Sequence, residues 1–346
     1  VGLIGSKLIE QIIQNAARIK DSLGIELIIN GLSNSRKMLI SADALDPGNY
    51  APLLESSKTP ANINQLIEKM VDYNFTHSIF IDNTASAEVP RFYERILDNN
   101  ISISTPNKVA MSSEFNQFIG LKSLSKKRGV PFKYETNVAA GLPVISTLEN
   151  LINSGDQISK IEAVLSGSVS YIFNTFSANG PDFSEVVKEA QTLGFTEPDP
   201  REDLSGADVR RKILILAREA GSEVESTDIE IHSILNDACL NAQSVEDFYV
   251  ELGKDNQRFR SSVTSAEKEN KRLRFIASFE GGKGVISLKA VPVNHPFYAL
   301  SGSDNMIVLH SNRYNRTPLV VRGPGAGADV TAAGVLAEII GIAGLI

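Results

Sequence analysis

Residues 78–105, SIFIDNTASAEVPRFYERILDNNISIST, contain two short apolar runs separated by a longer, more polar segment. Ser78 to Asp82 and Ile101 to Thr105 are predicted to be buried strands, and Glu88 to Asn99 is predicted to be a helix. A strand, a helix and a second strand in this order form the repeating unit of a parallel α/β sheet. The stretch therefore predicts that the first half of the chain is an α/β domain.

The same alternation continues toward the amino terminus. Helices are predicted over Ser6 to Ile19 and Asn62 to Asp72, and a short strand over Glu26 to Ile29. Gly2 and Gly5 lie directly before the first helix, where the glycine-rich turn of a dinucleotide-binding unit holds a pyrophosphate. In that interpretation the first strand and the first glycine lie upstream. The alternative is an ordinary junction between a loop and a helix.

Residues 30–37, NGLSNSRK, follow the predicted strand whose carboxyl end binds the adenosine ribose in such units. The segment has no Asp or Glu that could accept from a 2′-hydroxyl, whereas hydroxyl side chains, Arg36 and Lys37 would suit a 2′-phosphate. The pattern favours NADP, with NAD as the other option. Both cations are equally compatible with a solvated loop.

Composition excludes several classes of protein. The 346 residues carry 34 Lys+Arg and 41 Asp+Glu, a formal charge of −7, so binding to nucleic acid through bulk charge is not expected. A single cysteine, Cys239, cannot form an internal disulfide framework. The longest apolar run, residues 334–346, is too short to span a membrane, and no secretory leader is visible, so a cytoplasmic location is predicted. The four histidines lack metal-ligand spacing, which argues against a zinc enzyme.

The pattern of alternating predicted strands and helices ends near residue 141. Several predicted strands follow, at 160–165, 272–279, 285–293, 306–310 and 319–322. They indicate a second, mixed α/β domain built on an antiparallel sheet, and the last helix, residues 328–346, could pack back on the first domain. We therefore expect domains at 1–140 and 141–322, with 323–346 returning to the first.

One helix carries the clearest chemical signal. Asp208 and Lys212 are four residues apart, so they lie about 40° apart on one helix face. Apolar neighbours on that face would withdraw the pair from water, and a partly desolvated pair can transfer protons. The alternative is structural, because Ser205 and Asp208 have the spacing of a capping box.

Three further segments could contact ligands. Lys108 follows a predicted strand at the sheet edge where ligands bind, although the residues alone favour a proline-initiated turn with a solvated lysine. Gly167 and Ser168 form a small-residue turn that could offer amides. A carboxylate and three carbonyl groups that could hold a hard cation come from Glu135, Val138, Ala140 and Leu142.

Together these segments resemble the homoserine dehydrogenase family over essentially the whole chain. The motifs that carry the resemblance are DNTASAEV (82–89), ISTPNKVA (103–110), YETNVAAGLPVI (134–145), LSGSVSYIFN (165–174), LGFTEPDPREDLSGADVRRK (193–212) and GPGAGADVTAAGVLAEI (323–339). The resemblance implies a Rossmann-type nucleotide-binding domain joined to a catalytic and dimer-forming domain. It also implies NAD(P)-linked interconversion of L-homoserine and L-aspartate 4-semialdehyde, in threonine, methionine and isoleucine biosynthesis.

The resemblance also assigns roles to residues. Lys212 is the expected general acid/base, and Asp208 orients the substrate beside it. Glu197 would bind the substrate ammonium, Lys108 would reach both substrate and nicotinamide, and the remaining expected substrate contacts are Asp203, Gly167 and Ser168. The cofactor would be lined by Gly2, Ile4, Gly5, Arg36, Thr84, Lys108 and Gly327. The turn with Glu135, Val138, Ala140 and Leu142 matches a structural cation site, with sodium expected.

Two departures from the family pattern affect these assignments. Phe195 stands where the family usually has Tyr, so a hydroxyl near the substrate carboxylate is lost, whereas Ser168 replaces a common Thr and keeps its hydroxyl. The ends of the chain suggest the dehydrogenase part of a bifunctional aspartokinase/homoserine dehydrogenase, or a short single-function enzyme. The resemblance implies a homodimer or larger homo-oligomer. The rival hypotheses are a nucleotide-binding regulatory or dimerisation module without activity, and a dehydrogenase for another semialdehyde or 2-hydroxy acid.

Overall fold

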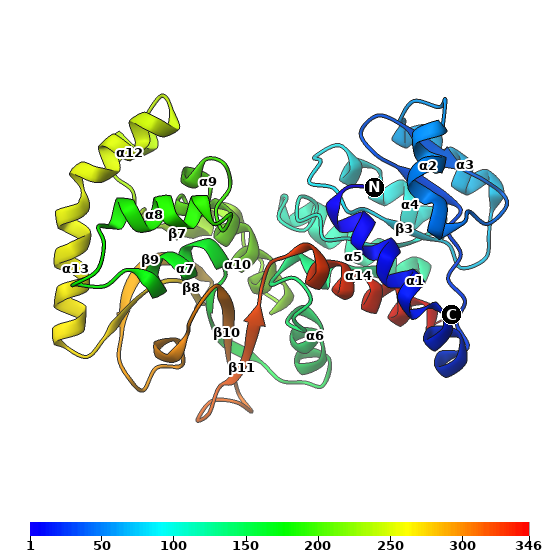
Figure 1. Ribbon diagram of the computed structural model, residues 1–346. Coiled ribbons are helices and arrows are strands. Elements are labelled where there is room, and N and C mark those ends of the chain that lie inside the picture. Colours follow the sequence, from blue (N-terminus) through cyan, green and yellow to red (C-terminus); the bar gives the residue numbers. More distant parts are fainter. Residues whose placement is uncertain (346) are drawn as a thin grey trace. The chain divides into compact units, whose positions relative to one another are not determined.

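The computed structural model describes residues 1–345 and divides into two compact units. The first contains Val1–Gly141 and Ala326–Ile346, and the second contains Leu142–Gly325. In Figure 1 the first unit is coloured blue to cyan, with the red carboxyl-terminal helix, and the second is mainly green to orange. Both units combine helices with a sheet, which confirms the predicted α/β class.

A parallel sheet forms the centre of the first unit. Its strands are β3 (Ile79–Ile81), β4 (Ser102–Ser104) and β5 (Phe132–Lys133), in that order. Ile103 is fully buried because helices cover the sheet. The helices of the first unit are α1 (Leu3–Leu23), α2 (Tyr50–Ser56), α3 (Ile63–Tyr73), α4 (Tyr93–Asp98), α5 (Phe115–Arg128) and α14 (Ala328–Ala343). The parallel pairing confirms the arrangement expected from residues 78–105.

The strand predicted over Glu26 to Ile29 is wrong. The first strand is β1 (Gly31–Ser33), which pairs in an antiparallel hairpin with β2 (Met38–Ile40). The predicted residues have no regular secondary structure and no ladder partner among residues 1–345, and Ile28 is 61% exposed. Strand formation depends on a neighbouring strand as well as on apolar side chains, so the local pattern alone misplaced this element.

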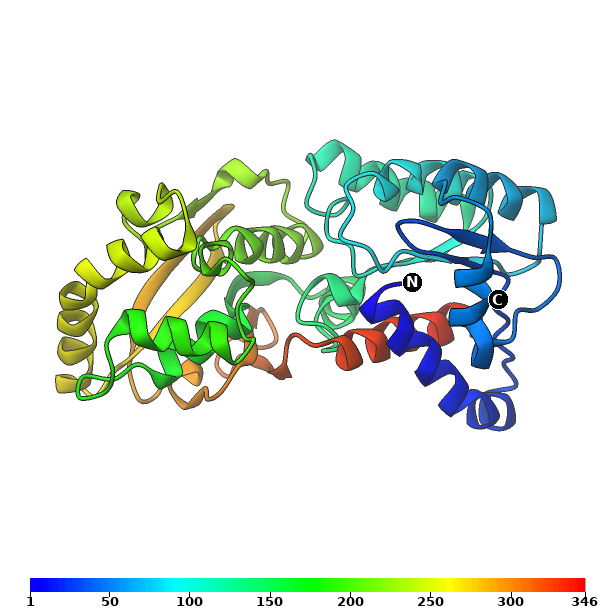
Figure 2. The same cartoon turned by 45° about the horizontal axis from the view of Figure 1, so that its top comes forward.

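The last helix packs on the first one in the same unit. Leu8, Ile12 and Ile19 of α1 form a buried cluster with Val335 and Ile339 of α14. Figures 1 and 2 both show α14, in red, beside α1, in dark blue. No helix within residues 1–345 is long and apolar enough to cross a membrane.

A six-stranded mixed sheet organises the second unit. In spatial order its strands are β11 (Leu319–Pro324), β10 (Asp304–Ser311), β6 (Ile158–Val164), β8 (Arg272–Glu280), β9 (Lys283–Val291) and β7 (Ile229–Ile231). All pairs are antiparallel except β7 with β9, so the predicted mixed sheet is confirmed. The helices of this unit are α6 (Ile145–Asn153), α7 (Gly167–Thr175), α8 (Phe183–Thr192), α9 (Pro200–Leu204), α10 (Ala207–Glu219), α11 (Asp237–Leu240), α12 (Val245–Lys254) and α13 (Asn256–Lys268).

Helices α7 and α10 both contact the central strand β8, and between them they carry the predicted catalytic residues and two of the predicted substrate-binding residues. The helix α10 begins after Gly206, whose φ of 76° is in the left-handed region that favours glycine. A Cβ at this position would also lie 3.1 Å from the ring of Phe275. Gly206 therefore sets the direction in which α10 crosses the sheet.

Candidate active site

Asp208 and Lys212 form the ion pair predicted from their spacing. Lys212 Nζ lies 2.8 Å from Asp208 Oδ2 on one face of α10. Lys212 is only 9% exposed, whereas the Asp208 side chain is 47% exposed. A buried ammonium requires acceptors, because an unpaired charge in the interior is costly. The pair thus has a lysine inside the unit and a carboxylate that still reaches solvent.

The backbone supplies a second acceptor to the lysine. Lys212 Nζ donates to the carbonyl oxygen of Leu165 at 2.7 Å, just after the end of β6. An ammonium group has three N–H donors, and among residues 1–345 the structure gives this one two acceptors. One N–H therefore remains available to an oxygen atom of a ligand.

The capping box considered for Ser205 and Asp208 does not form. The residue that precedes α10 is Gly206, and no side chain caps this helix end. Ser205 ends α9 instead: its Oγ donates to the carbonyl of Glu202 and accepts from the backbone N–H of Ala207. The left-handed turn at Gly206 separates the two helices, so the structural alternative for Asp208 is wrong.

Asp203 joins two of the other predicted substrate residues. Its Oδ1 accepts from Ser168 Oγ at 2.7 Å, and its Oδ2 accepts from the backbone N–H of Glu197 at 2.9 Å. Ser166 caps α7 and lies 2.9 Å from Ser168 Oγ, so this cluster begins one residue after Leu165. The Glu197 carboxylate is exposed and has no polar partner within residues 1–345. The structure thus brings Ser168, Asp203 and Glu197 together, close in sequence to Leu165, whose carbonyl accepts from Lys212.

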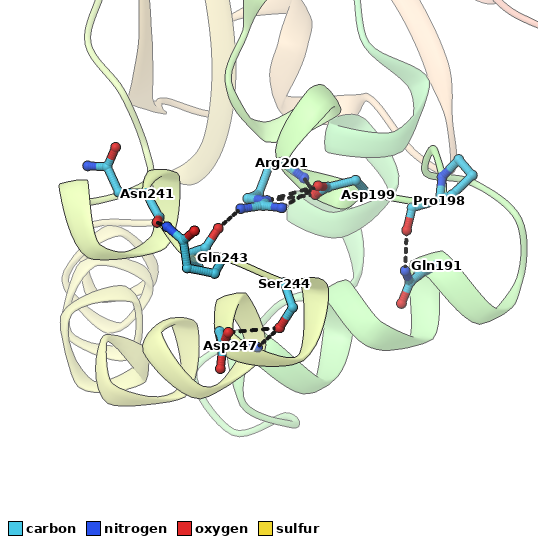
Figure 3. Close-up of polar contacts among 9 residues, drawn as sticks. Gln191, Pro198, Asp199, Arg201, Asn241, Gln243, Ser244 and Asp247 are labelled. Carbon is cyan, nitrogen blue, oxygen red and sulfur yellow. Dashed lines mark hydrogen bonds and ion pairs between the residues drawn. The ribbon is translucent and has the colours of Figure 1, made fainter.

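An arginine anchors the segment that carries these acids. Arg201 pairs with both carboxylate oxygens of Asp199 and donates from Nη1 to the carbonyl of Ala242, in the loop between α11 and α12 (Figure 3). The hydrogen bonds from Arg201 lower the pKa of Asp199. Gln191 of α8 donates to the carbonyl of Pro198 at 2.7 Å. The segment 198–201 is therefore fixed from two sides, and the sequence analysis missed this anchor.

In the first unit, a buried polar network links the ends of β3 and β4. The Asp82 carboxylate, 1% exposed, accepts from Tyr93 Oη at 2.6 Å, Asn107 Nδ2 at 3.0 Å and the backbone N–H of Thr84 at 2.9 Å. Burial, with the nearby Asp82 charge, raises the pKa of Tyr93. The network fixes the loop that carries Thr84 and also fixes Asn107, the residue before Lys108. Lys108 itself is half-buried. A carboxylate held only by neutral donors at a strand end is a structural clamp that sequence spacing does not reveal.

The predicted glycines occupy two helix starts of the same unit. Gly2 precedes α1, Ile4 and Gly5 lie in its first turn, and Gly327 precedes α14 with a φ of 118°. A Cβ at Gly5 would lie 3.7 Å from Asn83 Nδ2, and the buried Oδ1 of Asn83 has no partner among residues 1–345. Helix amides and an unsatisfied acceptor at the end of β3 fit a dinucleotide with hydroxyl and phosphate groups.

The hairpin loop separates the two cations predicted for a 2′-phosphate. Lys37 Nζ contacts the backbone and the carboxylate of Glu55, so this lysine is engaged within the protein. Arg36 is exposed, and its backbone N–H donates to Asn34 Oδ1. Arg36 is the cation of this loop whose side chain can reach a ligand.

The predicted cation turn is tightly wound. Glu135 begins a short 3₁₀ helix, and Ala139 and Ala140 follow with φ values of 59° and 53°. Buried oxygens of Thr136 and Asn137 have no hydrogen-bond partner among residues 1–345, a donor set that fits a hard cation. Leu142 belongs to the second unit. No cluster of three or more His, Cys, Asp or Glu side chains within residues 1–345 could hold a metal.

Comparison with known proteins identifies the family. Residues 1–135 match the family described as homoserine dehydrogenase, NAD binding domain, and residues 143–340 match the family described as homoserine dehydrogenase. The chain belongs to the homoserine dehydrogenase family. A homoserine dehydrogenase of Saccharomyces cerevisiae is 39% identical over 99% of this chain and 96% of its own length.

Other homoserine dehydrogenase relatives are longer. A chloroplastic bifunctional aspartokinase/homoserine dehydrogenase of Daucus carota is 39% identical over 99% of this chain, which spans 37% of that relative's length. Among solved structures, a protein of unknown function from Candida auris superposes with a TM-score of 0.90 at 32% identity, over 99% of this chain and 96% of the other.

The homoserine dehydrogenase pattern makes the contact of Phe195 informative. The ring of Phe195 stacks on Tyr171 of α7, with centroids 4.2 Å apart and planes 19° apart. Tyr171 Oη donates to Glu189, so its hydroxyl is used within the unit. Phe195 is 39% exposed, so the protein covers its ring only in part.

Proposed function

We propose that the chain catalyses the NADP-linked interconversion of L-homoserine and L-aspartate 4-semialdehyde. The observation that carries the proposal is the Asp208–Lys212 pair, in which a buried ammonium keeps one N–H for a ligand oxygen. Bound nicotinamide supplies or accepts the hydride. The enzyme is favoured over the regulatory module because both the catalytic and the NAD-binding family domains are matched.

Lys212 moves the proton that accompanies hydride transfer. When the semialdehyde is reduced, Lys212 Nζ donates its free N–H proton to the carbonyl oxygen as the hydride reaches the carbonyl carbon. In the reverse direction, neutral Nζ accepts the hydroxyl proton of homoserine. Asp208 lies beside the substrate, orients it and pairs with the lysine from the solvent side, and the Leu165 carbonyl holds the lysine from the protein side. Such positioned acid–base groups contribute about 10²–10⁴-fold to rate.

The acidic segment binds the amino-acid part of the substrate. The exposed Glu197 carboxylate pairs with the substrate ammonium, and Asp203 fixes the Glu197 backbone and Ser168. Gly167 and Ser168, in the first turn of α7, offer N–H groups to an anionic part of the substrate. Lys108 contacts substrate and nicotinamide.

The remaining assignments extend the proposal to the cofactor and the assembly. Arg36 binds the 2′-phosphate, which gives the preference for NADP over NAD. Cofactor contacts also come from Gly2, Ile4, Gly5, Thr84 and Gly327, and a sodium ion is held by Glu135 with carbonyls of Val138, Ala140 and Leu142. We propose a homodimer, a cytoplasmic location, and a place in either a single-function enzyme or a bifunctional aspartokinase/homoserine dehydrogenase.

The test is a spectrophotometric assay of reduced nicotinamide. Purified protein is supplied with L-homoserine and NADP or NAD, with D-homoserine and a simple 2-hydroxy acid as controls. We expect turnover with L-homoserine alone and a higher kcat/KM with NADP. Activity only with the 2-hydroxy acid would change the substrate class. Absence of turnover in a folded protein that binds NADPH would favour the regulatory module without activity.

A further inference from the structure

We infer that Asn305, on β10, is a positioning residue for Lys212. The inference rests on the proposed function, because it concerns the lysine that moves the proton. Asn305 is fully buried, and its Nδ2 donates to the carbonyl oxygen of Leu165 at 3.2 Å. This is the same oxygen that accepts from Lys212 Nζ at 2.7 Å. Two side chains from different elements thus converge on one backbone atom.

The side-chain amide of Asn305 lowers the stability of the folded protein. Its Oδ1 is buried and has no hydrogen-bond partner among residues 1–345. A buried acceptor without a partner costs about 1–3 kcal/mol, so an apolar residue would satisfy packing better. The orientation of the amide follows from chemistry, because only its nitrogen can face a carbonyl oxygen at hydrogen-bond distance. The donor directed at Leu165 is the feature that distinguishes Asn305 from an apolar core residue.

Backbone packing fixes Asn305 from the opposite side. Gly325 is buried, and a Cβ added there would overlap the Asn305 amide nitrogen and its carbon atoms. The amide is therefore held between the Gly325 backbone and the Leu165 carbonyl. The segment after β11 thereby helps to determine where Asn305 lies.

Fixing the carbonyl fixes the lysine. A lysine side chain is a flexible four-carbon chain, so the position of its ammonium group is determined by the acceptors that the group contacts. The Asp208 side chain is half-exposed, whereas Leu165 is 1% exposed, so the Leu165 carbonyl is the acceptor that the interior of the unit holds in place. When Nζ loses its proton during turnover, the ion pair weakens and the bond to Leu165 must hold the amine. Asn305 keeps that carbonyl directed into the site in both protonation states.

The first experiment separates positioning from packing with Asn305→Ala. We expect kcat to fall about 10- to 100-fold, because misplacement by about 1 Å costs this much, while KM for homoserine stays within about twofold. The solvent deuterium isotope effect on kcat should rise, because the proton transfer becomes slower than product release. NADPH affinity, measured by fluorescence titration, should not change.

Asn174→Ala is the matched control. Asn174 also donates from Nδ2 to a carbonyl oxygen in the same unit, that of Gly302 at 2.8 Å, and not to that of Leu165. It should leave kcat and the isotope effect unchanged. If Asn305→Ala keeps wild-type kcat, or loses kcat only in proportion to folded protein with an unchanged isotope effect, then Asn305 has a packing role and the inference fails. Absence of wild-type turnover would instead refute the proposed function.

Gly325→Ala provides a second, independent route to the same atom. The new methyl group would displace the Asn305 amide without changing its chemistry, so the same loss of kcat and rise in isotope effect are expected. Gly253→Ala, at a helical position with open space around it, controls for the substitution itself. In a double-mutant cycle, Asn305→Ala should have no further effect on the residual turnover of Lys212→Ala, whereas additive losses would show that Asn305 acts elsewhere.

Discussion

Lys212 is the residue whose environment is most specialised for chemistry. Its ammonium lies inside the second unit, yet its two acceptors within residues 1–345 leave one donor unused. Lys212→Ala should lower kcat by about 10²–10⁴-fold, because the proton that accompanies hydride transfer then has no donor. NADPH affinity should be unchanged, which a fluorescence titration can check.

Lys188→Ala is the control for this change. Lys188 is an exposed lysine of α8, with its Nζ 6.0 Å from the ring centre of Tyr249, and its removal should leave kcat at the wild-type value. Turnover of Lys212→Ala within a few-fold of wild type would assign the proton transfer to another group.

Glu162 gives the molecule a predictable response to acid. Contacts with His295 and Lys160, 3.9 Å and 3.1 Å away, lower its pKa to about 2 from 4.5. His310 lies 3.3 Å away on the neighbouring strand β10. Between pH 4.5 and 2 the unfolded chain binds a proton here that the folded chain does not, so stability falls as the pH falls. Glu162→Gln should reduce the loss in urea-unfolding free energy between pH 5 and pH 3, and an unchanged loss would contradict the assignment.

At the scale of elements, the Arg201 anchor determines where the acidic segment lies. Arg201→Ala should raise KM for homoserine about 10-fold, because Glu197 and Asp203 lose their fixed backbone, with little change in NADPH affinity. Arg201→Lys should not restore KM, because an ammonium cannot replace the paired bonds to Asp199. Arg316→Ala, at an exposed loop position, serves as the control in steady-state kinetics. Equal KM values for all variants would show that the anchor only stabilises the fold.

Elements were predictable where their own residues determine them. The strands of residues 78–105 lie in short runs centred on the buried Phe80 and Ile103, so local composition predicted them. The contact of Asp208 with Lys212 follows from helix geometry alone. The segment at Glu26 to Ile29 failed because pairing depends on a partner strand. The Arg201 anchor and the bond from Asn305 to Leu165 join residues that are 41 and 140 positions apart. Spacing along the chain contains no signal for such contacts.

For the whole molecule, the sequence predicted two kinds of sheet but not the contacts that join distant segments within each unit. The parallel and mixed sheets follow from the change from alternating helices and strands to closely spaced strands. In the first unit the Asp82 clamp depends on Tyr93 and Asn107 reaching one carboxylate, which requires the folded arrangement of β3, α4 and β4.

The first unit is closed by two chain segments that are more than 300 residues apart, so its stability should depend on their shared core. Ile339 of α14 is 3% exposed and packs in the cluster with Ile12 of α1. Ile339→Ala should lower the free energy of unfolding by about 2–4 kcal/mol, through lost burial and the remaining cavity. Ile13→Ala, on α1 but 43% exposed, should change it little. Scanning calorimetry with and without NADPH would test this, because the transition that NADPH raises should be the one that Ile339→Ala lowers. If Ile339→Ala lowers only a transition whose temperature NADPH does not change, then α14 does not stabilise the part of the unit that binds the nucleotide.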